Sequence, residues 1–390
     1  MTSGAALDRP LHGLRVLERA TGVAAQYCGR LLAVLGAEVT KVEPPGGCVS
    51  RRVPPLLHTA DQRHSSVLFE YLNVEKRSVT LRDDDEQGQR GLATLLERAD
   101  VFVDDTPVPR REAQGLDPDA VCSRYPHLVY LSVLPFGAYG PLRDFVGSEI
   151  ALFHSAGEGY LMPNGLALEK FPDRPPVKIY GHFAEIVGGT SAAGAAIVAA
   201  LAQLDGKGQF VDVSVQDANV AIGCFALQRL GDGVVENRHA RSFKYGGVLE
   251  CQDGHVELLV LEQHQWLGLM ALMGHPAWAA EFIDPMERGR RGSEINRYLR
   301  AWALQWTVAD LVRSGQAAKV PIAPYNDAPG VLNSPQNLER GVFTQATFEG
   351  MAREAMMVAP FRFPAQPLKA NSPAPAAGAH NAVVFSQEAP

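Results

Sequence analysis

The first forty residues contain a strand, a helix and a second strand, and this unit restricts the folds open to the chain. The apolar runs LRVLER at 14–19 and AEVTKVE at 37–43 have the length and composition of buried strands. The segment between them, GVAAQYCGRLLAVLG, has the pattern of a helix that ends at Gly36. Two consecutive strands joined through a helix lie parallel. The sequence therefore predicts a parallel sheet.

The same alternation continues along the chain. Further strands are expected at 76–83, 100–105 and 128–134, with a helix at 87–99 and a helical turn after GLDPDA. The middle of the chain is expected to be helical at 148–158, 183–204 and 214–230, with a strand at 208–215. Strands and helices in this order predict an α/β fold with a doubly wound, Rossmann-like parallel sheet.

The character of the sequence changes near Tyr245. Two apolar runs flank Asp253 and Gly254, which is a strong hairpin signal. Helices are expected to follow at 263–273, 294–306 and 307–314. We therefore predict that residues 1–225 form a large domain and that residues 240–325 form a smaller α+β domain.

Composition excludes several classes of function. The 390 residues carry a net charge of −7, which disfavours nucleic acid and anionic membranes as partners. The first 13 residues lack a signal-peptide pattern and no apolar run is expected to span a bilayer, so a cytoplasmic protein is expected. The five cysteines and 11 histidines form no close ligand pairs, so no metal is expected. ATGVAAQ, after the first strand, lacks the glycines of a nicotinamide site.

An ordered series of segments gives the chain a family resemblance. These segments are LHGLRVLERATGVAAQYCGRLLAVLGAEVTKVEPPGG, LNVEKRSVTL, LVYLSVLPFGAYGPLRD, PDRPPVKIYGHFAEIVGG, GKGQFVDVSVQDA, GGVLECQDGHVEL, VPIAPYND and PAPAAGAHN. Because these segments follow one another in this order, the chain resembles the family III CoA-transferases. This group includes formyl-CoA and carnitine CoA-transferases and 2-methylacyl-CoA racemases. The resemblance covers nearly the whole chain.

The resemblance implies an interlocked homodimer. Each chain would have a large CoA-binding domain built from both ends of the sequence, so residues 326–390 would return to it. Acyl-CoA and a small carboxylic acid would be the substrates. The family's nucleophile is an aspartate at the start of a Gly/Ala helix, and Glu185 lies at or within one residue of that position.

Two interpretations of Glu185 remain open at this stage. A carboxylate in the first turn of a helix faces unpaired N–H groups, which keep it ionised and nucleophilic. It would attack an acyl-CoA thioester, and CoA would then become attached to Glu185 as a thioester. The alternative is that Glu185 only stabilises the helix, by ~0.3 to 1 kcal/mol. Backbone N–H groups at the helix start or at 245–247 are candidate oxyanion donors.

A second acidic residue, Glu149, also has a catalytic interpretation and a structural one. Glu149 occupies a place where the family often has an acid in the cleft. Close to Glu185, its charge would raise one of the two pKa values and make that group a proton donor. It is equally well interpreted as a helix cap. Residues of 148–165 and the loop at 241–247 are expected to choose the acyl group. Because Phe153, Tyr160, Leu161 and Met162 are apolar, they favour an apolar acyl chain over oxalate, but the same residues could instead form core at a domain interface.

The resemblance also indicates CoA-binding residues. Lys76 is the expected phosphate contact, with Leu72 and Asn73 as neighbours, and Val23 matches a position that lines the pantetheine channel. The position of an arginine in the family is occupied by Ala113 here, so Arg110 or Arg111 is expected to substitute for it from the same loop, at the adenosine end of CoA. These two arginines are equally well interpreted as surface charges.

Two other functions compete with CoA transfer. A racemase needs two bases on either side of the α-carbon, but Ser148 stands where the family's racemases have histidine; His154 and His182 are close in sequence. The second alternative is a non-catalytic subunit that binds acyl-CoA.

Overall fold

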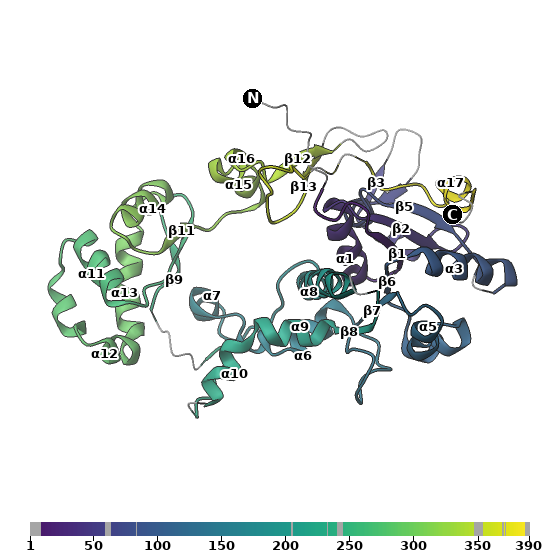
Figure 1. The fold of residues 1–390 in the computed structure, drawn as a ribbon. Helices are drawn as coiled ribbons and strands as arrows, with labels where there is room; N and C mark the ends of the chain where they lie inside the picture. The colour runs from purple at the N-terminus through teal and green to yellow at the C-terminus, as the bar shows by residue number, and fades with distance from the viewer. Residues whose placement is uncertain are drawn as a thin grey trace. The chain divides into compact units, whose positions relative to one another are not determined.

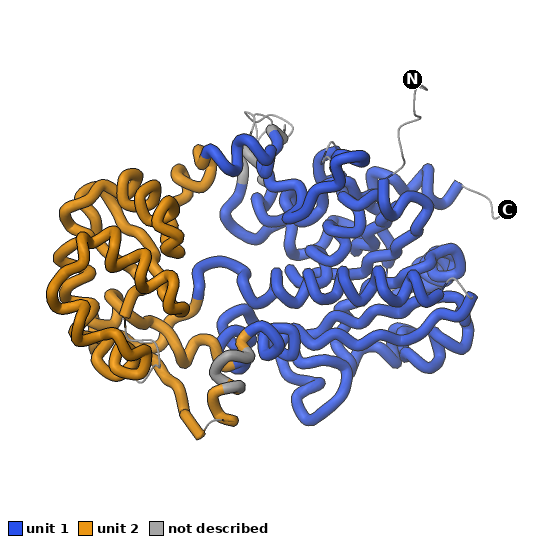
Figure 2. Tube along the Cα trace, turned by 60° about the vertical axis from the view of Figure 1, so that its left-hand side comes forward, with its two compact units in different colours: residues 1–156, 179–222, 335–390 blue, residues 157–178, 223–334 orange. Residues whose placement is uncertain are grey.

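The computed structural model describes residues 9–58, 64–82, 84–203, 206–231, 233–239, 245–346, 354–368, 370 and 372–386. The chain divides into two compact units, which Figure 2 shows in separate colours. Unit 1 comprises residues 1–156, 179–222 and 335–390, and unit 2 comprises residues 157–178 and 223–334. The N-terminal and C-terminal parts of the chain therefore belong to the same unit.

A six-stranded sheet in the order β5-β2-β1-β6-β7-β8 forms the centre of unit 1 (Figure 1). Its strands are β1 (Arg15–Arg19), β2 (Glu38–Glu43), β5 (Arg77–Thr80), β6 (Val101–Asp104), β7 (Val129–Leu134) and β8 (Phe210–Ser214). All neighbouring strands are parallel, which confirms the predicted parallel sheet. Successive strands add on one side of β1 and then on the other, so the order reverses between β1 and β6. In doubly wound sheets, ligands bind at this switch point, beyond the carboxyl ends of the strands.

Helices cover both faces of this sheet. Helices α1 (Val23–Val34) and α8 (Phe183–Ala202) lie on one side, and α3 (Glu86–Arg98) and α5 (Pro118–Arg124) lie on the other (Figure 1). On the α3 side, Leu17, Phe102 and Tyr130 of the strands pack in one cluster with Leu95 and Leu96 of α3. Helix α17 (Asn381–Ser386) adds Val384 to this cluster, so the end of the chain helps to close the core.

Helices α1 and α8 pack closely because Gly189 lies between them. A Cβ on Gly189 would stand 2.5 Å from the Ala24 carbonyl oxygen. Helix α8 is nonetheless long and apolar enough to span a membrane by length and composition, contrary to the sequence expectation. Its contacts with α1 are those of a core helix, while Val198 and Leu201 remain exposed.

Unit 2 has its own sheet and core. The hairpin expected around Asp253 and Gly254 is present as β9 (Gly247–Glu250) and β10 (His255–Leu258), and β11 (Ile322–Pro324) pairs with β10. Helices α11 (Gln263–Leu272), α13 (Gly292–Ala303) and α14 (Val308–Ala317) cover this sheet. Their buried side chains, with those of the sheet, form one apolar cluster.

The structure departs from the predicted boundaries in the middle of the chain. Residues 157–178 belong to unit 2, because Lys170 of α7 (Gly165–Lys170) pairs with Glu250 at 3.0 Å and Glu169 pairs with Arg300. The helix expected at 148–158 is α6 (Glu149–Ser155), which ends before Gly157 at φ +99°. The helix expected at 214–230 is divided at Gly223 into α9 (Val215–Ile222) and α10 (Cys224–Gly231).

The remaining elements are short. They are β3 (Leu56–His58), β4 (His64–Ser66), α2 (Val67–Leu72), α4 (Val108–Arg111), α12 (Pro285–Arg290), α15 (Ala328–Leu332), α16 (Pro335–Glu339), β12 (Phe343–Ala346) and β13 (Glu354–Met357), with single 3-10 turns at Val49–Arg52, Glu112–Gln114, Glu158–Leu161 and Ala277–Phe282.

Candidate functional site

Glu185 lies in the first turn of α8, as the sequence predicts. The helix has His182 as its N-cap residue, so Glu185 is the third helical residue. A glutamate at this position often accepts a hydrogen bond from the N-cap backbone as part of a capping box. No capping box is present here. The side chain of His182 does not bind the helix backbone, and the carboxylate of Glu185 contacts the His182 side chain instead.

Another segment caps α8. Glu149, the first residue of α6, accepts hydrogen bonds from the backbone N–H of Ala184 at 3.2 Å and of Glu185 at 3.1 Å, one on each carboxylate oxygen. These are the N–H groups that an N-cap side chain would usually bind. A carboxylate that accepts from both of these N–H groups acts as a cap. The geometry therefore supports capping for Glu149, and its role as a proton donor stays a prediction.

Glu185 is left with one partner. Its Oε2 lies 2.6 Å from Nδ1 of His182, which must carry the proton because an ionised carboxylate only accepts. Glu185 is 20% exposed and His182 is 39% exposed. The Oε1 atom of Glu185 makes no hydrogen bond within the described residues. One carboxylate oxygen is thus held and the other is available to a substrate.

Neighbouring elements of unit 1 fix the first turn of α8. Asn219 of α9 donates from Nδ2 to the carbonyl oxygen of Ala184 at 3.0 Å. Phe183 packs against Phe153 of α6, with ring centroids 6.0 Å apart. These contacts keep the backbone that carries Glu185 in place. They also place Phe153 in the core, where it is 1% exposed, which supports the alternative interpretation of this side chain as core.

A second candidate region is a cavity of about 300 Å³ at the switch point of the sheet. It is lined by residues that follow β1, β2 and β6, namely Arg19, Ala20, Thr21, Val42, Glu43, Pro44, Cys48, Asp105, Thr106, Pro107, Arg110 and Gln114. Arg110 is exposed here, and its role as a phosphate contact stays a prediction. The Oε1 atom of Gln114 is buried and has no hydrogen-bond partner within the described part of the chain.

The N-terminus of α1, next to this cavity, is occupied by a carboxylate of the protein. Asp105 accepts from the backbone N–H groups of Thr21 at 2.8 Å and Gly22 at 2.6 Å. Burial, opposed by these hydrogen bonds, raises the pKa of Asp105 to about 6. In a dinucleotide-binding fold a pyrophosphate would lie against such N–H groups. Here the protein's own carboxylate takes that position.

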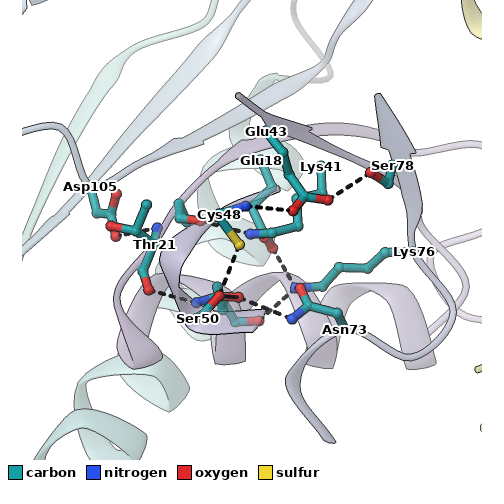
Figure 3. Close-up of polar contacts among 12 residues, drawn as sticks. Glu18, Thr21, Lys41, Glu43, Cys48, Ser50, Asn73, Lys76, Ser78 and Asp105 are labelled. Carbon is teal, nitrogen blue, oxygen red and sulfur yellow. Dashed lines mark hydrogen bonds and ion pairs between the residues drawn. The ribbon is translucent and has the colours of Figure 1, made fainter. Parts of the chain in front are cut away.

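Lys76 makes its contacts inside the protein in this structure, and its predicted contact with a phosphate stays a prediction. Its Nζ donates to Glu18 Oε2 at 2.6 Å, to the Gln26 carbonyl oxygen at 2.9 Å and to Asn73 Oδ1 at 3.0 Å (Figure 3). An ammonium group has three protons, and all three are used. The side chain is fully buried, and burial lowers the pKa of Lys76 to about 8.

Lys76 belongs to a larger buried network beneath α1. Glu18 also binds Lys41 at 2.9 Å, so one carboxylate neutralises two lysines in part. Asn73 donates to Gln26 and to the Phe69 carbonyl oxygen, which fixes its amide within the protein. Leu72 is likewise fully buried. The residues of LNVEK that match the family therefore hold α1 on the sheet in this structure.

The two arginines of the next loop differ. Arg111 is 2% exposed, and its Nε donates to the Thr106 carbonyl oxygen while Nη2 donates to Ser132 Oγ. Arg111 therefore lies in the interior, and its predicted contact with CoA stays a prediction. Arg110, one residue earlier, is exposed. Val23 is the first residue of α1 and is buried, and its place beside pantetheine stays a prediction.

Other sequence predictions lie in unit 2. The N–H of Gly246 donates to Asn296 Oδ1 at 2.8 Å, so it is not free to bind an oxyanion. Tyr160, Leu161 and Met162 belong to this unit, and residues 241–244 lie outside the described residues. No group of three metal-ligating side chains is found in the described part of the chain.

Sequence reasoning named His182 only in connection with a racemase and did not pair it with Glu185, and it missed the role of Asp105. A single histidine before a helix carries no pattern, so only the 2.6 Å contact with Glu185 identifies its partner. The sequence places Asp105 only at the end of a strand. Its proximity to Thr21 and Gly22 follows from the pairing of β1 with β6, which the alternation of strands alone does not specify.

Comparisons with known proteins identify the family of the chain. Residues 11–381 match the family model described as CoA-transferase family III. A probable CoA-transferase of Mycobacterium tuberculosis is 32% identical over 90% of this chain, and the chain spans only 44% of that protein. The succinate–glutarate CoA-transferase of Agrobacterium fabrum is 27% identical, with 97% of this chain and 95% of that protein covered.

A solved structure gives the same result for the fold. The crystal structure of a CAIB/BAIF family protein from Brucella suis superposes with a TM-score of 0.82 at 27% identity. The superposition covers 98% of this chain and 100% of that one. The likeness therefore extends over both compact units.

Proposed function

The chain belongs to CoA-transferase family III, as its sequence indicated, and from this membership we propose that it transfers CoA through a covalent thioester on Glu185. The observation that carries the proposal is the arrangement at the start of α8. Glu149 caps the helix in place of Glu185, so the Glu185 carboxylate is not needed as a cap and one of its oxygens is free.

The reaction needs no external base. The Glu185 carboxylate attacks the thioester carbonyl carbon, the C–S bond breaks, and a mixed anhydride and CoA thiolate form. The thiolate attacks the Glu185 carbonyl carbon, and the acyl group leaves as a carboxylate. The acceptor acid then attacks the glutamyl thioester to give a second anhydride. The thiolate finally attacks the acceptor's carbonyl carbon and regenerates ionised Glu185, with no net transfer of protons.

The switch-point cavity is the proposed site for the adenosine end of CoA. Arg110 supplies a positive charge for a phosphate. The unpartnered Oε1 of Gln114 supplies an acceptor for an amino or amide N–H. Because Asp105 already occupies the N-terminus of α1, we propose that the pyrophosphate is held by side chains of the cavity and not by that helix.

Small dicarboxylic acids are the proposed substrates. The relative from Agrobacterium fabrum is named for succinate and glutarate, which makes succinyl-CoA the first donor to try. We also propose a cytoplasmic homodimer, with exposed apolar side chains of α8 such as Val198 and Leu201 in its interface. Light scattering on the purified chain and cell fractionation test these two points.

The test is a transfer assay. Purified protein is mixed with succinyl-CoA and a panel of carboxylic acids, and new CoA esters are identified by mass spectrometry. Glu185→Gln should abolish their formation. Glu86→Gln is the matched control, since Glu86 also lies in a first helical turn but is exposed on α3. Turnover in Glu185→Gln would contradict the proposal, and acyl-CoA binding without any turnover would favour the non-catalytic subunit.

A further inference from the structure

The tetrahedral intermediates on Glu185 need a hydrogen-bond donor. When CoA thiolate attacks the Glu185 carbonyl carbon, the electron pair of the C=O bond moves onto the carbonyl oxygen. Enzymes stabilise such an oxyanion with preorganised N–H donors. The backbone N–H groups of Ala184 and Glu185 are the nearest in sequence, but both donate to Glu149.

His182 is the donor that the structure provides. Its Nδ1 lies 2.6 Å from Oε2 of Glu185, and its ring sits at the start of the same helix turn. If the acyl group is attached through the free Oε1, Oε2 becomes the carbonyl oxygen of the anhydride and then the oxyanion. The donor is therefore already in place before the charge develops.

The length of the glutamate side chain makes this contact useful. Glutamate has one more rotatable bond than aspartate, and the freedom it loses when it is ordered opposes a precise attack. The hydrogen bond from His182 fixes Oε2, and so fixes the direction in which Oε1 points. The side chain of His182 makes no hydrogen bond to the backbone of α8, so the bond to Glu185 is its evident contact.

We propose that His182 is a catalytic residue that orients the Glu185 carboxylate and stabilises the oxyanion on Oε2. The inference rests on the proposed function, since it requires that Glu185 is the nucleophile. A neutral imidazole with its proton on Nδ1 is sufficient for both roles. The anhydride C–O bond breaks as the oxyanion collapses, and the acyl carboxylate leaves without a proton from His182.

The inference is tested by single-turnover kinetics with succinyl-CoA as the probe. The rate at which the Glu185–CoA thioester forms is followed by acid quenching and mass spectrometry. In His182→Leu this rate should fall about a hundredfold, the loss typical of one oxyanion donor, while KM for succinyl-CoA changes less than about twofold. His182→Asn, whose amide N–H can replace Nδ1–H, should recover at least about tenfold of the loss.

A second histidine–glutamate pair gives a matched control. His264 Nδ1 lies 3.1 Å from Glu262 Oε2, but both side chains are exposed, on unit 2. His264→Leu should leave the rate unchanged. Circular dichroism and thermal unfolding verify that the His182 variants fold, as expected because Glu149 keeps the cap.

The outcomes separate this inference from the proposed function. Wild-type protein that forms no adduct on Glu185 and shows no transfer would overturn the nucleophile and the role of His182 together. An adduct that forms equally fast in His182→Leu would overturn the role of His182 alone. Equal losses in His182→Leu and His182→Asn would also overturn it, because a donated hydrogen bond would then not be the relevant property.

Discussion

Helices α1 and α8 lie side by side, and each has its N-terminus bound by a carboxylate from another segment. At α1, Asp105 binds the N–H groups of Thr21 and Gly22. At α8, Glu149 binds those of Ala184 and Glu185. The N-cap residue of α1, Gly22, has no side chain, and the side chain of His182 does not bind the backbone of α8. At α1 the bound N–H groups belong to the N-cap residue and the residue before it, whereas at α8 they lie within the first turn.

The difference is a second carboxylate. The first turn of α1 has no acidic residue, whereas that of α8 carries Glu185, partly exposed and with one free oxygen. Beneath α1, the charges of Glu18, Lys41 and Lys76 are fully buried and satisfied within the protein. We infer that charges around α1 maintain the fold and that the extra charge at α8 performs the chemistry.

The largest expected effect is on stability, at α1. In Lys76→Met, Glu18 keeps only Lys41 as a charged partner, and Asn73 and the Gln26 carbonyl oxygen each lose a donor. Breaking a buried ion pair typically lowers the free energy of unfolding by about 3 to 5 kcal/mol. Urea unfolding followed by circular dichroism measures the loss, with exposed Lys207→Met as the control. A stable variant with a strongly raised KM for acyl-CoA would show instead that Lys76 binds phosphate.

The next effect concerns the cap of α8. Glu149→Ala leaves two N–H groups without their acceptor and should lower the free energy of unfolding by about 1 to 2 kcal/mol. Glu149→Gln retains an acceptor oxygen and should lose about half as much. Thermal and urea unfolding test both variants. If Glu149→Gln were fully stable but lost one limb of the pH–rate profile, Glu149 would be a proton donor.

Arg110 should affect binding without affecting the fold. Arg110→Ala is expected to raise KM for acyl-CoA about tenfold with kcat unchanged, the scale of one charge-assisted phosphate contact. The effect should shrink as salt is added, because Arg110 is exposed. Arg90→Ala, at an exposed ion pair on α3, is the control. An unchanged KM for acyl-CoA at low salt would show that CoA does not bind in the switch-point cavity.

The smallest effect is a pH dependence at α1. The pKa of Asp105 is raised from 3.8 to about 6, so between these values the folded state holds a proton that the unfolded state has lost. Ionisation of Asp105 therefore makes the folded state less stable as pH rises through this window. Because asparagine carries no charge, Asp105→Asn should gain stability relative to wild type as pH rises from about 4 to about 6, and the difference between the two proteins should be constant outside this window.

The measurement is urea unfolding of both proteins at several values of pH. A constant stability difference across the window would show that Asp105 does not titrate there, and that its contact with Thr21 and Gly22 serves the fold at every pH.

Periodicity and turn signals were sufficient to predict the strands of the main sheet and the position of Glu185 at the start of α8. They were not sufficient for the surroundings of single charged residues. Nothing local to Lys76 shows that Glu18, Gln26 and Asn73 converge on its ammonium group. Likewise, the capping of α8 by Glu149 depends on how two helices 35 residues apart in sequence meet. Such contacts arise from tertiary packing, which a single sequence does not specify.

The central claim is that Glu185 becomes covalently attached to CoA, and trapping tests it most directly. The protein is incubated with succinyl-CoA, quenched with hydroxylamine or borohydride, and digested for peptide mapping by mass spectrometry. We predict modification at Glu185 in wild-type protein, and none there in Glu185→Gln. Transfer of CoA to an acceptor acid with Glu185 unmodified would contradict the account.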